Sequence, residues 1–98
     1  MVTVKHSWRQ AIITRYHGPT NFRGSRVTAT ASAGKATVAW DHALSADENH
    51  AEAAKLLCEK FDWTGTLVGG TLADGDRVWT FEQTPREAEA ERANKEVA

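Results

Sequence analysis

One basic and aromatic segment carries the side chains of this 98-residue chain that are best suited to binding chemistry. Its arginines can grip phosphate or carboxylate through two parallel hydrogen bonds. Its aromatic rings can stack on bases or anchor a protein interface, and its glycines let backbone amides approach an anion. The candidate partner-binding residues are Arg15, Tyr16, His17, Asn21, Phe22, Arg23 and Arg26. The alternative is a solvated loop whose polar side chains stabilise their own turns.

The charge distribution along the chain favours the same region. Residues 1–40 contain no Asp or Glu but hold six of the twelve Lys and Arg residues, whereas all thirteen acidic residues follow from Asp41 onward. Arg26, Thr28 and Thr30 share one side of an alternating segment, so the basic character extends from the loop onto a strand face. Such asymmetry concerns partners rather than fold. It predicts one surface that meets phosphate or an acidic protein.

An acidic helix offers a second candidate surface. Asp47, Glu48, Glu52 and Glu59 lie in a helix-prone segment and could meet a basic partner or imitate phosphate. Lys55 and Lys60 interrupt this run, so an ordinary solvated helix face is the alternative interpretation.

Catalytic and metal-binding patterns are missing from the sequence. Asp41, His42, Asp47 and His50 have no recognised zinc spacing. No nucleophile elbow positions Ser, His and Asp for a triad. Cys58 falls on the apolar stripe of the helix, where it is expected to be a small core residue. We therefore expect no enzyme activity, no metal and no cofactor.

The elements that must position these residues follow from hydrophobic periodicity and turn residues. Ser45 and Glu48 have the spacing of a capping box, which begins a helix that ends near Asp62. Asp74-Gly75 indicates a hairpin turn, and Gly69-Gly70 indicates a bulge or a close backbone approach. The predicted strands cover 10–16, 25–31, 35–40, 66–72 and 77–81.

These elements predict an α+β fold, with a mainly antiparallel sheet of five strands and one helix packed on a face. The helix falls between the third and fourth strands, and a C-terminal helix follows Thr84-Pro85. We expect a flexible N-terminal segment over 1–9, a single domain over 10–82, and a C-terminal helix or tail over 83–98.

The composition of the chain bears on where in the cell the protein is located. No apolar run approaches the roughly 20 residues of a membrane helix, so no membrane partner is expected. The N-terminus lacks the apolar stretch of a signal peptide, and a single cysteine suits a reducing compartment. These features predict a cytoplasmic protein.

The run from Tyr16 to Arg26 resembles a family of short proteins that phages, plasmids and other bacterial mobile elements encode. Asp41-His42-Ala43-Leu44, Asn49-His50 and Val68-Gly69-Gly70 contribute weaker parts of the resemblance, which spans about Ala11 to Phe81. The resemblance implies a bacterial host. Members of the family are mostly uncharacterised, so no catalytic residues can be carried over to this chain. Small proteins of mobile elements often block host defences, including CRISPR–Cas surveillance complexes.

The resemblance and the charge pattern together lead us to expect a non-enzymatic, anti-CRISPR-like inhibitor. It would dock on a Cas effector complex or another host defence protein by charge complementarity, and block DNA binding or nuclease recruitment. The alternative is a small accessory protein that binds nucleic acid through the basic Arg15–Arg26 loop and sheet face. A structural or regulatory subunit that homodimerises through a strand edge is a third class.

Overall fold

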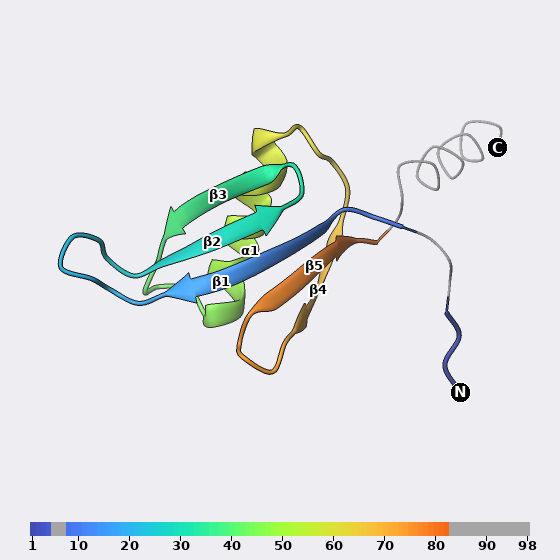
Figure 1. Ribbon diagram of the computed structural model, residues 1–98, viewed down its shortest axis with the longest axis horizontal. Helices are drawn as coiled ribbons and strands as arrows, with labels where there is room; N and C mark the ends of the chain where they lie inside the picture. Colours follow the sequence, from blue (N-terminus) through green and yellow to red (C-terminus); the bar gives the residue numbers. More distant parts are fainter. Residues whose placement is uncertain (5–7, 83–98) are drawn as a thin grey trace.

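The computed structural model, which describes residues 1–4 and 8–82, is a five-stranded antiparallel sheet with one helix packed on one face (Figure 1). Its spatial strand order is β3-β2-β1-β5-β4. The elements are β1 (Ala11–His17), β2 (Arg26–Ala31), β3 (Gly34–Ala39), α1 (Ala46–Lys60), β4 (Leu67–Thr71) and β5 (Arg77–Phe81). The predicted α+β fold and element order are confirmed, with strand ends shifted by one residue at several positions. The C-terminal helix predicted after Thr84 lies outside the described residues.

Alternation along β1, β2 and β3 separates two faces of the sheet. Val27 and Ala29 are buried toward α1, whereas Arg26 and Thr28 lie on the opposite side, which we call the outer face. Cross-strand pairs such as Val27 with Val38 keep each face continuous from strand to strand. The alternation predicted from sequence is confirmed, and it assigns the basic residues to the side without a helix.

Both ends of helix α1 are capped by groups that satisfy free backbone donors or acceptors. Ser45 Oγ accepts the Glu48 amide at 3.2 Å and Glu48 Oε1 accepts the Ser45 amide at 3.4 Å, which confirms the predicted capping box. Asp62 takes the left-handed conformation, with φ at 56°, just beyond the helix. The Trp63 amide then donates to the Cys58 carbonyl at 2.9 Å, as in a Schellman motif. The chain therefore leaves α1 in a fixed direction, toward β4.

The core lies between α1 and the three strands that it covers. Ile12, Val27 and Ala29 come from the sheet, and Ala53, Ala54 and Leu57 come from the helix. Burying one Leu, Ile or Val side chain contributes about 1.5–3 kcal/mol. Cys58 completes this layer, and burial raises the pKa of its thiol, with a smaller effect from Glu59. Cys58 is a core residue, as predicted.

A buried amide holds the segment between β3 and α1 against the start of the helix. Asn49 Oδ1 accepts the Asp41 amide at 2.8 Å, and Asn49 Nδ2 donates to the carbonyls of Asp41, Leu44 and Ser45. Asp41 Oδ1 also accepts the Ala43 amide at 2.9 Å, which helps to order this loop. Because its amide is fully used, Asn49 is buried without a desolvation penalty from unpaired groups.

The hairpin of β4 and β5 extends the sheet beyond β1, on the side away from β3 and beyond the part that α1 covers (Figure 1). Its turn has Gly75 at a φ of 93°, a conformation that glycine adopts without strain. Gly69 lies under the Trp79 ring, and a Cβ there would be 2.8 Å from ring carbons. The β4–β5 register runs without a break, so the glycine pair marks a close approach rather than a bulge.

Candidate anion-binding face

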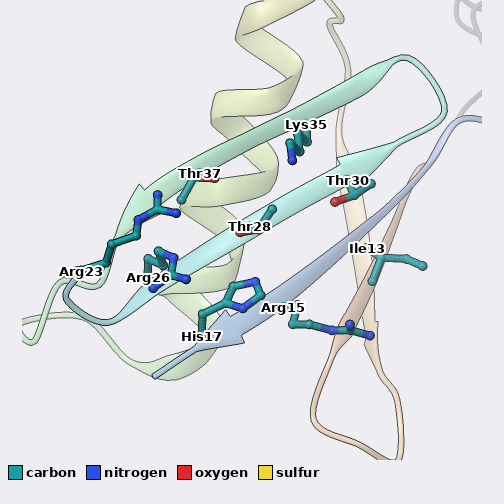
Figure 2. Close-up of a pocket in the computed structure, with 9 residues that line it drawn as sticks. All are labelled: Ile13, Arg15, His17, Arg23, Arg26, Thr28, Thr30, Lys35 and Thr37. Atoms are coloured by element: carbon teal, nitrogen blue, oxygen red, sulfur yellow. The ribbon is translucent and has the colours of Figure 1, made fainter. Parts of the chain in front are cut away.

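Three strands place a set of basic and hydroxyl side chains on the outer face, where they line a shallow depression of about 480 Å³ (Figure 2). We call this set the basic face. Its cross-strand pairs include His17 with Arg26 and Thr30 with Lys35. The lining residues are Ile13, Arg15, His17, Arg23, Arg26, Thr28, Thr30, Lys35 and Thr37. Among the described residues, no Asp or Glu lines the depression, so its lining carries positive charge without an acidic side chain.

Three cations of the basic face keep their charge available. Arg23, Arg26 and Lys35 make no ion pair with any residue in the described part of the chain. Arg26 Nη1 donates only to the Gly24 carbonyl, at 3.4 Å, which leaves most of its donors unused. A bound anion would therefore gain charge-assisted hydrogen bonds without breaking existing ones.

Arg15 behaves differently from the other arginines of the candidate set. Its Nε and Nη2 both reach Asp76 Oδ2, at 2.9 and 2.8 Å, and Figure 2 shows the side chain turned toward the β4–β5 hairpin. The hydrogen bond and charge of Asp76 raise the pKa of this guanidinium. Arg15 therefore joins β1 to the start of β5, and its charge is largely matched by a neighbour.

The loop between β1 and β2, residues 18–25, projects beyond the sheet (Figure 1). Thr20 organises its tip, because Thr20 Oγ1 accepts the amides of Phe22 and Arg23, at 3.3 and 3.0 Å, and the Thr20 amide donates to the Arg23 carbonyl at 2.7 Å. Phe22 is 95% exposed and Asn21 is also exposed. A self-stabilised turn thus presents an aromatic ring beside Arg23, while part of the loop serves its own structure.

Tyr16 is separated from the rest of the candidate set. It lies between Arg15 and His17 in β1, so its side chain points to the helix side of the sheet. There its ring meets Trp40 edge-on, with centroids 4.9 Å apart, and its hydroxyl donates to Ser25 Oγ at 3.2 Å. Tyr16 therefore anchors the end of β3 instead of joining the basic face.

The acidic alternative surface is partly used by the fold. Asp47 pairs with Arg77 at 2.9 Å, and Glu48 closes the capping box. Glu52 and Glu59 are exposed on α1. Because α1 covers the face opposite the basic face, the charge imbalance along the sequence becomes a separation between two sides of the molecule.

A buried polar cluster that the sequence analysis missed joins α1, β1 and β5. His50 Nδ1 lies 2.8 Å from Thr14 Oγ1, and the Trp79 indole donates to the same oxygen at 2.9 Å. Arg77 Nη1 lies 3.2 Å from His50 Nε2. Since a guanidinium only donates, Nε2 is the accepting nitrogen and Nδ1 carries the proton that Thr14 receives. The Thr14 hydroxyl can then donate to the Arg77 carbonyl, at 3.5 Å.

This cluster keeps His50 neutral. Burial is the main cause that lowers the pKa of His50, and the positive charge of Arg77 acts in the same direction. Asp47 and His50 lie one turn apart on α1, and Arg77 lies against both of them. No group of three or more metal-ligating side chains occurs among residues 1–4 and 8–82. We call this cluster the joint, because it connects α1 to β1 and β5. Sequence spacing alone could not show that residues of these two strands contact the helix.

Comparisons with protein-family models, with curated proteins and with solved structures find no match to this chain. In the described part of the chain, no helix has the length and apolar character needed to cross a bilayer.

Proposed function

We propose that this protein is a non-enzymatic binding protein of a bacterial mobile element that docks its basic face on an anionic surface of a host defence nucleoprotein. The supporting observation is the depression on the outer face, whose lining residues include no Asp or Glu and where Arg23, Arg26 and Lys35 make no ion pair among the described residues. Such a face favours association by charge complementarity. The proposed target, a Cas surveillance complex, rests on the sequence resemblance and not on geometry.

The basic face is a better candidate than the acidic helix for this docking. Asp47 and Glu48 are committed to an ion pair and a helix cap, so a partner would compete with the fold for them. On the basic face only Arg15 is committed in this way. Phe22, fully exposed on the loop next to Arg23, adds an aromatic anchor of the kind that dominates binding energy in protein interfaces.

The protein would inhibit the host complex by occupying one of its binding surfaces. A protein of this size, seated on the surface that recognises DNA or recruits a nuclease, would exclude the second partner by steric overlap. No chemical step is needed, which agrees with the absence of a recognised catalytic motif in the sequence.

The test is a phage-plaquing assay in CRISPR-active cells, together with pull-down of purified Cas surveillance complexes. The double variant Arg23→Glu with Arg26→Glu should lose binding and restore immunity, because it reverses charge in the depression. The matched control, Glu52→Lys with Glu59→Lys, changes the net charge by the same magnitude in the opposite direction, on exposed positions of α1, and should retain activity. Unchanged immunity across several Cas types would refute the inhibitor proposal. Loss of activity only in the helix variant would move the docking site to α1.

Nucleic acid is a second candidate partner, and the hydroxyl groups of the basic face favour it. Thr28, Thr30 and Thr37 lie among the cations, as hydroxyl and guanidinium donors do around phosphate. With three or four cations, binding to a single strand should weaken with a log–log salt slope of about −2 to −3. Titrations with labelled single-stranded DNA and RNA at two salt concentrations test this. Absence of binding at low salt would eliminate it and leave an acidic protein surface as the partner.

A further inference from the structure

The two edges of the sheet differ in how they are protected. At the β3 edge, Lys35 places a charge within the strand, and Lys60 Nζ from α1 donates to the Lys35 carbonyl at 3.0 Å. Charged side chains and covering groups of this kind prevent an edge strand from pairing with another chain. The β3 edge is therefore blocked by the protein itself.

The β4 edge has none of these devices. Residues 64–73 contain no charged residue and no proline, and among the described residues no strand pairs with the open side of β4. Val68 and Leu72 are 48% and 45% exposed beside it. An uncharged, apolar edge strand of this kind is a template for pairing with a further strand.

The hydrogen-bond pattern identifies which groups the open edge offers. The Glu82 amide donates to the Thr66 carbonyl, and the Leu72 amide donates to the Asp76 carbonyl, both at 2.7 Å. Even-numbered residues of this segment therefore bond to β5, and alternation turns the amides and carbonyls of Leu67, Gly69 and Thr71 away from it. These three residues form a ladder without a partner.

We propose that β4 pairs antiparallel with β4 of a second copy of this chain, about a two-fold axis at Gly69. This register is the one that uses every open group, because Leu67 of each copy faces Thr71 of the other and Gly69 faces its own equivalent. On the outer face, Val68 of each copy lies opposite Gly70, which leaves room for the larger side chain. No like charges meet, since the segment has none.

The two-fold axis of this dimer is perpendicular to the sheet, which determines the direction in which the basic faces point. The outer faces of both copies lie on the same side of one continuous sheet, so the two basic faces point in one direction. Their apolar borders, which include Val68 and Val78, meet at the centre. The dimer does not depend on the proposed function, because association can be measured with the protein alone.

Sedimentation equilibrium of the full chain over a concentration series tests the proposal. The wild-type protein should show a monomer–dimer equilibrium, and Val68→Lys should weaken association about tenfold or more, because it adds charge at the pairing edge. Thr71→Pro removes a donor that faces the partner but not β5, and should also weaken association. Its matched control, Thr37→Pro, removes the equivalent outward donor from the β3 edge and should leave association unchanged.

Amide hydrogen exchange gives a second, residue-resolved measurement. In the dimer the amides of Leu67 and Gly69 should be protected, and dilution should release them, whereas those of Val68 and Gly70 stay protected by β5 at all concentrations. A monomer at every concentration up to about 1 mM, or a dimer that Thr37→Pro disrupts and both β4 variants leave intact, would overturn the proposal. So would protection of Leu67 and Gly69 only after addition of a foreign protein, because the edge would then belong to that protein's strand.

Discussion

The helix-backed half of the sheet and the helix-free hairpin bury their apolar side chains by different means. In β3, β2 and β1 the small and branched residues of one face are sealed by α1. In β5 and β4 the equivalent face is covered by its own rings, with Trp79 over Gly69 and Phe81 against Trp63 at 6.4 Å. The helix-backed half can therefore carry charge on its outer face, because its stability is provided from the opposite side. The hairpin has no such support, and its outer face is apolar instead.

Besides the β1–β5 ladder and the Arg15–Asp76 ion pair, a buried polar cluster holds the two halves together. Thr14 receives hydrogen bonds from His50 of the helix and from Trp79 of the hairpin, while Arg77 contacts both His50 and Asp47. The hairpin is therefore attached through these polar contacts as well as through Leu67, Trp79 and Phe81, which pack against the edge of the apolar core. The comparison can be tested by weakening each half and the joint separately.

The largest expected effect is in the helix-backed core. Leu57→Ala should lower the free energy of unfolding by about 3–4 kcal/mol, because it empties a fully buried position between α1 and the sheet. Leu67→Ala, a matched change on the partly buried face of the hairpin, should cost only about 1 kcal/mol. Urea denaturation followed by tryptophan fluorescence measures both. Equal losses would contradict the distinction between the halves.

The joint should show the next largest effect. Thr14→Val keeps the shape of the side chain but leaves the N–H groups of His50 and Trp79 without an acceptor, so unfolding should become easier by about 2–3 kcal/mol. Thr28→Val, on the outer face of the neighbouring strand, should change stability by less than about 0.5 kcal/mol. Chemical denaturation of the two variants gives the comparison. A neutral Thr14→Val would mean that the cluster does not connect the halves.

Two adjacent glycines test the packing of the hairpin. Gly69→Ala should cost about 1–2 kcal/mol, because the added methyl group would displace the Trp79 ring. Gly70→Ala meets nothing within 4 Å and should be neutral within about 0.5 kcal/mol. Thermal denaturation and near-ultraviolet circular dichroism report stability and the environment of the ring. If both variants behave alike, Trp79 does not depend on close contact with Gly69.

The smallest expected effect is a dependence on pH through His50. Because the folded protein holds the pKa of His50 below its ordinary value, the unfolded chain takes up a proton first as pH falls. Stability is therefore complete above about pH 6.5 and declines from there toward the folded pKa. The urea concentration at the midpoint of unfolding should fall as the pH is lowered across this range, and His50→Gln should make this dependence on pH weaker. His42→Gln, at an exposed position, should preserve it; an unaltered slope in His50→Gln would exclude His50 as the cause.

Local patterns in the sequence were sufficient to predict most of the fold. The capping box at Ser45 and Glu48, the alternation in β2 and the Asp74-Gly75 turn each depend on neighbouring residues and are confirmed. The same alternation places Tyr16 on the opposite face of β1 from Arg15 and His17. The division of the candidate set between two faces could therefore be predicted from the alternation of side chains along a strand.

Contacts between distant elements could not be predicted in this way. Thr14 and His50 are 36 residues apart, and Arg15 and Asp76 are 61 residues apart. The first pair depends on α1 packing over β1, and the second depends on β5 lying beside β1. Hydrophobic periodicity specifies neither arrangement. Sequence spacing therefore does not reveal that His50 is buried, and it groups Arg15 with Arg23 and Arg26, which make no ion pair among the described residues.

The position of Cys58 gives the molecule a built-in probe of its own opening. This single cysteine lies on the buried, sheet-facing side of α1, so a thiol reagent can reach it only when the helix separates from the sheet or the whole chain unfolds. The rate of labelling would measure how often that separation occurs under native conditions. It would also reveal whether a partner bound on the far side of the sheet slows this fluctuation, without any label being placed on the binding surface.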